Sequence, residues 1–386
     1  MKNHLLQILL LAIAFISLQS CKDEVVDPDP MEHQPGTNKL VQVPADYPTI
    51  QEAISQVSSG DSIIVSPGTY EENIDYLGKN ILITSLFYKD QDISYISSTI
   101  IQGKSGSVVR FMNGENSKAI IQGFTISGGT GDIYTRPNGN ITLGGGGILA
   151  LESSPTIRYN IIENNEATDI SGANGAAGGG GLRMELGSPS IHNNIIRNNK
   201  GGFGGGVFLD ATEAIFKNNV ISGNEAIRAD FGGGGGLYLD FVKPNSNGNK
   251  VYNNTIVNNL SAGEGGGLVI AGNTAYDNLV FINNIIFNNE NNEVFTRLDA
   301  NSEDFHPSYC LIFGGWTYGT NIIEEDPKLI ETSFLLENNS PCIDAGEPSV
   351  AYNDHNNGGN ALPPCMGTSR NDIGAYGGPK AMKLLP

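Results

Sequence analysis

The chain has 386 residues, of which 50 are glycine and 16% are charged, and its formal net charge is −19 at pH 7. A charge of that sign argues against nucleic acid and anionic membrane surfaces as partners, because their phosphates would repel it. Abundant glycine with few charged residues is typical of a turn-rich β protein. We expect one elongated, monomeric body with a terminal cap rather than two domains.

Residues 1–20 form a predicted targeting signal. Their apolar run, from Leu5 to Leu18, is too short to span a bilayer and ends just before Cys21. This arrangement resembles a bacterial lipoprotein signal, in which the residue matching Cys21 is lipidated. The resemblance implies an outer-membrane lipoprotein that contacts the membrane only through its lipid anchor. Lys22–Glu24, directly after the cysteine, is similar to the acidic tag that sends lipoproteins of the Bacteroidota to the cell surface. Gln19 departs from the small residue usual at its position, so cleavage by an ordinary signal peptidase is the alternative.

The polar, proline-containing residues 21–42 are predicted to be a flexible tether. After them, Thr49 with Glu52 three residues later predicts the start of a helix. The apolar stripe of this helix consists of Ile50, Ala53, Ile54 and Val57. Strand patterns then begin at Ser62–Ser66 and Ile81–Ser85.

Three short segments in this region resemble the start of right-handed β-helix proteins of the pectate-lyase-like and pectin-esterase-like superfamily. They are Pro44–Gln51, Asp61–Val65 and Pro67–Tyr70. The resemblance implies a right-handed parallel β-helix over residues 43–325, with the predicted helix capping the first coil. It does not identify an activity, because the superfamily includes lyases, hydrolases, esterases, epimerases and members without catalysis.

Five copies of one motif occupy residues 144–289. Each copy opens with glycines and a short apolar strand, and closes on a strand flanked by asparagine. The last glycines of the openings, at positions 147, 181, 206, 236 and 267, are separated by 34, 25, 30 and 31 residues. Such a unit has no core of its own and buries its apolar residues by stacking on the next unit, about 4.8 Å away. The pattern predicts an all-β parallel β-helix of about ten coils.

One asparagine recurs at the same place in every closing strand. These residues are Asn160, Asn194, Asn219, Asn254 and Asn284. We interpret them as a ladder of side-chain amides that bond along the stack, where asparagine also tolerates a left-handed turn. A sugar-binding role for them is the alternative.

The strand after each glycine run predicts which side chains leave the core. With a period of two, its first and third residues face inward and its second and fourth face outward. The second-position column is Leu149, Arg183, Phe208, Tyr238 and Val269. The fourth-position column is Leu151, Glu185, Asp210, Asp240 and Ala271. A slip of one residue would reverse this assignment.

Glu185, Asp210 and Asp240 would stand about 5 Å apart, where ionised carboxylates repel one another. Either a Ca²⁺ ion bound by all three or a proton retained by one of them would relieve the repulsion. With Ca²⁺, we expect Asp210 and Arg183 to act in β-elimination on a uronate. With a shared proton, two carboxyl groups could act as acid and base on a glycosidic bond. A solvated acidic face without chemistry is the third interpretation.

Four residues are candidates for binding sugar around that column. Phe208 and Tyr238 offer flat rings on which sugars could stack, and Arg136 and Arg228 lie in long segments on either side of a short turn. A short turn between long ones predicts a notch, with Asp210 near its floor.

Residues 326–386 are predicted to be a small C-terminal cap. Pro341–Gly346 and Arg370–Gly377 resemble the module that follows β-helices in bacterial surface proteins, and a solenoid needs a cover on its last edge. Cys342 and Cys365 lie in this cap, and the oxidising setting of an exported protein favours a disulfide between them.

The leading hypothesis from the sequence is a surface lipoprotein that binds extracellular acidic polysaccharide and cleaves a uronate-containing one with help from Ca²⁺. Two alternatives stay open: a non-enzymatic adhesin or structural solenoid, and a glycoside hydrolase that needs no metal. A structural solenoid would not depend on the charge of Asp210, whereas either enzyme would.

Overall fold

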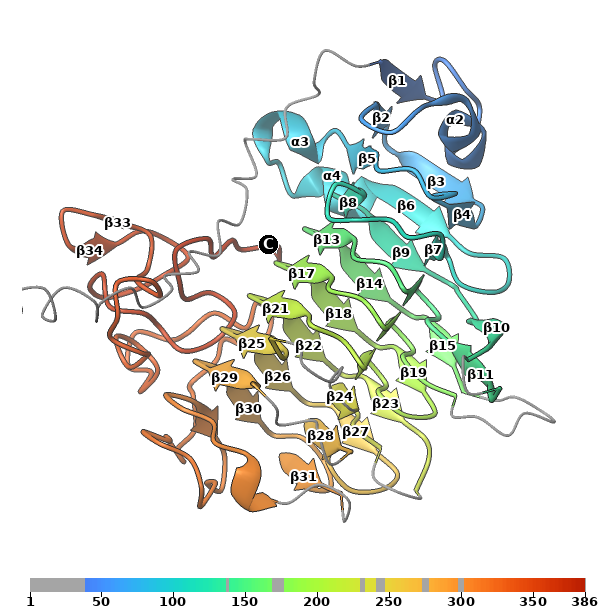
Figure 1. Ribbon diagram of the computed structural model, residues 1–386. Helices are drawn as coiled ribbons and strands as arrows, with labels where there is room; N and C mark the ends of the chain where they lie inside the picture. Colours follow the sequence, from blue (N-terminus) through green and yellow to red (C-terminus); the bar gives the residue numbers. More distant parts are fainter. Residues whose placement is uncertain are drawn as a thin grey trace, which may run out of the picture. The chain divides into compact units, whose positions relative to one another are not determined.

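The computed structural model describes residues 39–136, 139–168, 177–229, 233–240, 247–272, 278–297 and 302–385. In these ranges the chain winds through three long parallel sheets, which it visits in the same order coil after coil (Figure 1). The predicted signal and Cys21 lie outside the described residues. Within the described ranges, no helix is long and apolar enough to cross a membrane.

Each sheet is named here with its strands in spatial order. Sheet A consists of β1 (Leu40–Val43), β2 (Ser62–Val65), β5 (Leu82–Ser85), β8 (Ile120–Gln122), β13 (Thr156–Arg158), β17 (Ser190–His192), β21 (Ile215–Lys217), β25 (Lys250–Tyr252) and β29 (Val280–Ile282). Sheet B consists of β3 (Gly68–Glu71), β6 (Thr99–Gln102), β9 (Thr125–Ser127), β14 (Ile161–Glu163), β18 (Ile195–Arg197), β22 (Val220–Ser222), β26 (Thr255–Val257), β30 (Ile285–Phe287) and β32 (Leu311–Ile312). Sheet C consists of β4 (Ile74–Asp75), β7 (Val109–Phe111), β12 (Ile148–Leu151), β16 (Leu182–Glu185), β20 (Val207–Asp210), β24 (Leu237–Asp240), β28 (Leu268–Ala271) and β31 (Val294–Thr296).

Smaller elements accompany the three sheets. A short parallel sheet contains β15 (Glu166–Ala167), β19 (Lys200–Gly201), β23 (Glu225–Ala226) and β27 (Leu260–Ser261). Two antiparallel hairpins are β10 (Asp132–Thr135) with β11 (Ile141–Gly144), and β33 (Asn356–Asn357) with β34 (Asn360–Ala361). The helices are α2 (Ile50–Gln56), α3 (Phe87–Asp90), α4 (Ser94–Ser98) and the 3₁₀ turn η1 (Ser302–Asp304).

Neighbouring coils are in register, so equivalent residues stack on one another. In sheet C, for example, one column of pairs consists of Ile148, Leu182, Val207, Leu237 and Leu268. These first-position side chains are fully buried and belong to one apolar core that the three sheets share. The predicted strand alternation and register are confirmed.

Helix α2 packs at the start of the solenoid, as the sequence predicts. The Thr49 hydroxyl accepts a hydrogen bond from the Glu52 amide at 3.1 Å, which caps the N-terminus of the helix. The stripe residues Ile50, Ala53 and Ile54 are fully buried in the solenoid core. Sheet A begins at Leu40, inside the segment predicted to be a tether, because β1 pairs with β2.

Two asparagine ladders run along the stack. In the predicted one, each Nδ2 group donates to the Oδ1 atom of the next asparagine, at 3.2, 3.1, 3.1 and 2.9 Å along Asn160, Asn194, Asn219, Asn254 and Asn284. The second ladder, which the sequence analysis did not identify, is formed by Asn165, Asn199, Asn224, Asn259 and Asn289. Residues of the first ladder are at most 1% exposed, so the ladder interpretation holds and these amides are not available to a sugar.

The last coil is closed by residues 302–323. Phe305 is 1% exposed, belongs to the solenoid core and packs edge-on against Phe281, with 5.2 Å between ring centroids. Trp316 packs on Phe305 at 5.5 Å and donates from Nε1 to the Phe305 carbonyl oxygen at 3.1 Å. These rings cover the end of the core that the predicted C-terminal cap was expected to cover.

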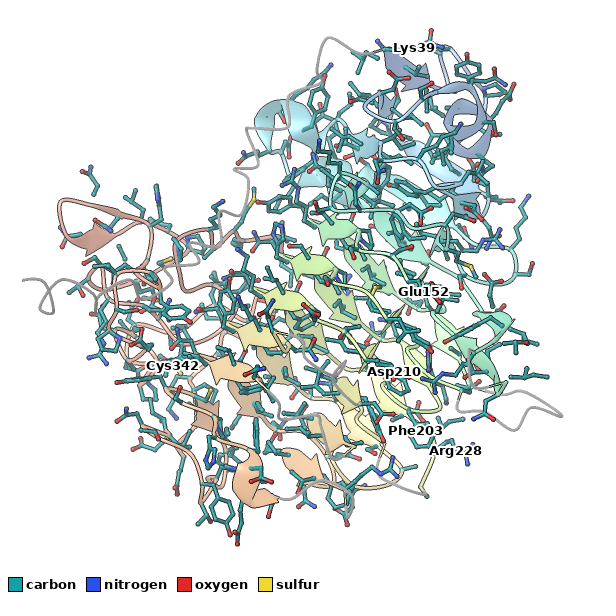
Figure 2. The ribbon with its side chains drawn as sticks, viewed as in Figure 1. Lys39, Glu152, Phe203, Asp210, Arg228 and Cys342 are labelled. Atoms are coloured by element: carbon teal, nitrogen blue, oxygen red, sulfur yellow. The ribbon has the colours of Figure 1, made fainter. Side chains whose placement is uncertain are left out.

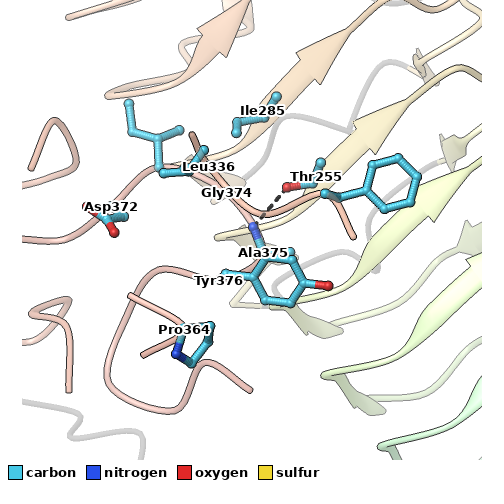
Figure 3. A pocket seen from close by; sticks show the side chains of 10 residues that line it. Thr255, Ile285, Leu336, Pro364, Asp372, Gly374, Ala375 and Tyr376 are labelled. Atoms are coloured by element: carbon cyan, nitrogen blue, oxygen red, sulfur yellow. Dashed lines mark hydrogen bonds between the residues drawn. The ribbon is translucent and has the colours of Figure 1, made fainter. Parts of the chain in front are cut away.

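Residues 326–385, called the C-terminal strap below, lie instead along the side of the solenoid where sheets A and B meet (Figure 1). Three turns between these sheets contain asparagines with φ of 52°, Asn193, Asn218 and Asn253. Their Nδ2 groups donate to backbone carbonyl oxygens within residues 372–380 at 2.7 to 3.2 Å. The Ala375 amide donates to Thr255 Oγ1 at 2.9 Å (Figure 3). The predicted end cap is therefore corrected to a lateral strap.

Cys342 and Cys365, in the strap, are buried free thiols, and the predicted disulfide is not formed. Cys342 packs with Leu336 and Ile373, whereas the Cys365 sulfur lies 3.7 Å from the Gly378 carbonyl oxygen. The prediction rested on an oxidising setting. Such a setting allows a disulfide to form but does not bring two cysteines into the geometry that a disulfide requires.

Candidate functional site

The outer face of sheet C carries both predicted columns in register. Arg183, Phe208 and Tyr238 pair in turn, as do Glu185, Asp210 and Asp240, which are called the acid column below. Figure 2 shows Asp210 on the same flank of the solenoid as Phe203 and Arg228, while Cys342, in the strap, lies on the other flank. The period of two in the sequence was sufficient to bring these residues together.

This face is buried, whereas the sequence predicted an exposed surface. Arg183 is 0% exposed, Asp210 1% and Glu185 2%, although none of them belongs to the apolar core. They are buried because the hairpin β10–β11, inserted between two coils, covers them from outside. The interpretation of the column as a solvated acidic face is therefore wrong.

The hairpin reaches the acid column through Tyr134 and Arg136. The Tyr134 hydroxyl donates to Glu185 Oε2 at 2.7 Å, and Arg136 Nε donates to Glu185 Oε1 at 2.7 Å. Arg136 Nη2 also bonds to Asp210 Oδ2. The sequence analysis named Arg136 but missed Tyr134, because it read residues 129–143 as a long loop and did not recognise the alternation of a hairpin.

Arg183 joins the same carboxylates from below the hairpin. Its Nη2 group lies 3.3 Å from Glu185 Oε2 and 3.3 Å from Asp210 Oδ2. The guanidinium plane also stacks on the Phe208 ring, 4.2 Å from its centroid. Two arginines thus neutralise two carboxylates, which relieves the repulsion in the acid column.

Protonation differs along the acid column. Burial would raise the pKa of Glu185, but Arg183, the Tyr134 hydrogen bond and Arg136 outweigh it and hold the pKa below its usual value. Burial raises the pKa of Asp210 to about 6, against the opposing effect of Arg183 and Arg136. Burial and the neighbouring Asp210 raise the pKa of Asp240 to about 7. Asp240 Oδ1 has no hydrogen-bond partner among the described residues, so Asp240 is the member that retains a proton near neutral pH.

The aromatic rings next to the column are covered. Phe208 and Tyr238 are each 2% exposed, and their centroids lie 4.8 Å apart. Phe203 packs against Tyr238 at 5.6 Å, and Arg228 lies 5.2 Å above the Phe203 ring. Phe208 and Tyr238 are therefore not free stacking platforms, which corrects that prediction, because the sequence does not indicate what packs on an outward side chain.

Arg297 is a second residue that the sequence analysis missed. It follows β31, and its Nη1 group donates to the Tyr238 hydroxyl at 3.0 Å. Its charge lowers the pKa of Asp240 and so partly opposes the burial that raises it. The repeat that opens with glycines ends before β31, so no sequence motif indicated a role for Arg297.

A calcium ion does not fit the acid column. Among the described residues, no three carboxylate, histidine or cysteine groups are placed to hold a metal ion. Oxygens of Glu185 and Asp210 already accept hydrogen bonds from Arg136 and Arg183, and two guanidinium charges would repel a divalent cation.

Comparison with known proteins identifies the family. The model of the right handed beta helix region matches residues 79–241 and 144–322. The chain belongs to this right-handed β-helix family. Its solenoid is similar to that of a pectin methylesterase from Aspergillus niger, with 12% identity, a TM-score of 0.40 and coverage of 76% of this chain and 88% of that one. A pectate lyase gives 12% identity, a TM-score of 0.42 and coverage of 88% and 96%. No curated protein matches this β-helix chain.

Proposed function

We propose that this β-helix protein acts outside the cell on an acidic polysaccharide and hydrolyses it with Asp240 as the proton donor. The observation that carries the proposal is the composition of the outer face of sheet C. There, two stacked carboxyl groups with raised pKa values, Asp210 and Asp240, lie among arginines.

The arginines support an anionic substrate. Three of the eight arginines in the chain act on the acid column: Arg136 and Arg183 bond its carboxylates, and the charge of Arg297 lowers the pKa of Asp240. The column has three carboxyl groups, one of which retains a proton near neutral pH. Among these described residues, guanidinium groups outnumber ionised carboxylates by one, within a chain of net charge −19. Local positive charge attracts a polyanion, and guanidinium groups bind carboxylates through paired hydrogen bonds.

Asp240 has the properties of a general acid. It is partly exposed, whereas Asp210 and Arg183 are buried, so Asp240 is the column member that a sugar can contact. In the proposed step, its proton passes to the glycosidic oxygen as the C–O bond breaks, and water adds its hydroxyl to the anomeric carbon. The proton that this water releases returns through solvent to the Asp240 carboxylate. Asp210, assigned by sequence to direct catalysis, acts instead by raising the pKa of Asp240, and Arg183 balances the charge of Asp210.

The test is a panel of neutral and acidic polysaccharides, with release of reducing ends as the sign of hydrolysis and ultraviolet absorbance of unsaturated ends as the sign of elimination. We expect reducing ends from an acidic polymer, unchanged by chelator. Asp240→Asn should abolish cleavage and keep binding, whereas Arg297→Gln should weaken binding. A protein that neither binds nor cleaves any polymer would refute the proposal.

A second candidate, a non-enzymatic surface solenoid, is favoured by the near-complete burial of Arg183, Glu185 and Asp210. In that case the ion network holds the hairpin in place and has no chemical role. The same panel distinguishes the enzyme from the structural solenoid. If the protein is a structural solenoid, the wild-type chain and Asp240→Asn would show the same low binding and cleavage.

We further propose that the protein is displayed as an outer-membrane lipoprotein, anchored through Cys21. The support is the apolar run of the first 20 residues followed by that cysteine. Metabolic labelling with a fatty acid should mark the wild-type chain and fail to mark Cys21→Ala. Labelling of both chains alike would contradict a lipid at Cys21.

A further inference from the structure

The C-terminal strap and Gln91, which follows helix α3, border a groove of about 830 Å³. Three stretches of the strap line it, within residues 330–336, 361–367 and 381–383. We propose that this groove binds a long-chain fatty acid, whose chain lies against the apolar walls and whose carboxylate pairs with Lys383. The inference is independent of the proposed function, because no residue of the acid column lines the groove.

The walls of the groove are mostly apolar. Nine of its thirteen lining residues are isoleucine, leucine, alanine, proline or methionine. Ile330 is 41% exposed, and Leu335, Met366 and Met382 are partly exposed, so apolar side chains meet water inside a concave surface. The volume lies in the usual range of small-molecule sites, and methionine side chains adapt to the shape of a ligand. A ligand with an apolar chain would remove this area from water.

Hydrogen bonds from behind hold the wall that residues 361–368 form. Asp372 Oδ2 accepts from the Met366 amide at 2.7 Å, and Asp344 Oδ1 accepts from the Thr368 amide at 2.9 Å. Asp372 is 1% exposed, so this support is inside the strap. The wall needs no ligand to hold its shape, and a site that is already formed pays less ordering entropy on binding.

The backbone along the groove favours an acyl chain over a peptide. The amides of Ile330 and Cys365 donate to carbonyl oxygens of the strap at 2.8 and 3.1 Å, and Pro363 and Pro364 have no amide hydrogen. An extended peptide binds by adding hydrogen bonds to an exposed backbone edge, and these four residues offer no donor for them. A hydrocarbon chain needs no hydrogen-bond partner along its length.

Lys383 sets the charge of the ligand. It is the only charged residue among the described residues that line the groove. Lys383 is partly buried, and its ammonium has no hydrogen bond or ion pair within the described part of the chain. An ammonium group that is partly withdrawn from water is stabilised by an anion beside it. One carboxylate on a long apolar tail matches one ammonium in an apolar groove, whereas a polyanionic sugar would leave the walls in contact with water.

Titration of the full chain with cis-parinarate, a fatty acid whose fluorescence rises in an apolar site, tests the proposal. We expect saturable binding and displacement by palmitate. Hexadecanol has the same chain length without the charge and should compete at least about tenfold less well, because it forms no ion pair with Lys383. A wild-type chain without saturable fluorescence, or equal competition by palmitate and hexadecanol, would overturn the proposal.

Two matched pairs of variants locate the bound fatty acid. Lys383→Gln should weaken parinarate binding about tenfold, whereas Lys328→Gln, at a strap lysine that pairs with Asp326 at 3.0 Å outside the groove, should not change it. Ile330→Glu places a carboxylate beside the chain and should weaken binding by about the same factor. Val350→Glu, at a strap residue that is 86% exposed and outside the groove, should have no effect.

All four side chains reach solvent, so the melting temperature of each variant should stay close to that of wild type and report an intact fold. Equal effects within either pair would show that the fatty acid binds elsewhere and would overturn the groove as its site.

Polygalacturonate, a uronate polymer, separates this inference from the proposed function. It should not displace parinarate, whether or not the protein cleaves it, because the groove and the acid column share no residue. Displacement by the polymer would place the parinarate site at the acid column and refute the groove.

Discussion

Two added segments cover outward faces of the same solenoid, the C-terminal strap over the junction of sheets A and B and the hairpin β10–β11 over sheet C. The strap is held by asparagine side chains that bond its backbone and by apolar side chains such as Tyr376, Leu384 and Leu385. Strand β10 of the hairpin contacts the acid column through ion pairs and one hydroxyl, and its Ile133 is exposed. Both faces are buried, but apolar contact is more extensive under the strap than under the hairpin, whose buried apolar cluster is Leu143 with Ala167 and Ala177. Burial alone therefore does not show which kind of contact holds a covering segment in place.

One tyrosine in each segment allows the stability contributions of the strap and the hairpin to be compared. Tyr376 of the strap is 6% exposed and donates to the Ser333 carbonyl oxygen at 3.0 Å, so Tyr376→Ala should cost about 3–5 kcal/mol of unfolding free energy. Tyr134→Ala on the hairpin should cost about 1 kcal/mol, since it loses mainly one hydrogen bond. Urea denaturation of the two variants measures the difference. Equal losses would mean that the hairpin is as much a part of the folded body as the strap.

Asparagines at left-handed turns allow a closer test of the strap. The two N–H groups of Asn253 (φ 52°) Nδ2 are shared among three acceptor oxygens of the strap, whereas Asn258 (φ 57°) has the same conformation on an exposed turn outside it. Replacement by Ala imposes the same backbone strain at both positions. Asn253→Ala should therefore cost about 2 kcal/mol more than Asn258→Ala, from the hydrogen bonds alone. Matching losses in urea denaturation would show that these bonds do not stabilise the strap.

The pH dependence of stability tests the acid column. The pKa of Asp240 rises to about 7 on folding, so its protonated form favours the folded state. That contribution is complete below the ordinary pKa of an aspartate and is lost as the pH rises through about 7. Asp240→Asn should therefore gain about 2 kcal/mol over wild type between pH 5 and pH 8. This gain in unfolding free energy is smaller than the roughly 4 kcal/mol that corresponds to the full shift in the pKa of Asp240, because Asp240 stays partly exposed. The exposed Asp304→Asn is the control, and identical pH profiles for all three proteins would contradict a raised pKa.

The smallest expected effect is that of calcium. Because Arg136 and Arg183 already bond the Glu185 and Asp210 carboxylates, millimolar Ca²⁺ should leave the melting temperature of the full chain unchanged relative to chelator. A rise that Asp240→Asn abolishes would restore the metal site predicted from the sequence.

The sequence by itself determined the solenoid. Glycine openings, asparagine ladders and a period of two are local signals repeated at fixed spacing, so they fixed the coils, the capping helix α2 and the register that stacks Glu185, Asp210 and Asp240. Such signals specify which side chains leave the core, because alternation along a strand needs no knowledge of distant residues.

Tertiary structure alone decided what covers those side chains. The bond from Arg136 to Asp210 joins residues 74 positions apart, and that from Asn253 to Gly374 joins residues 121 apart. No local pattern records such contacts, which depend on where an inserted hairpin and a returning C-terminus come to lie. These coverings turned an expected open carboxylate column into an arginine-neutralised network with Asp240 as its partly exposed member.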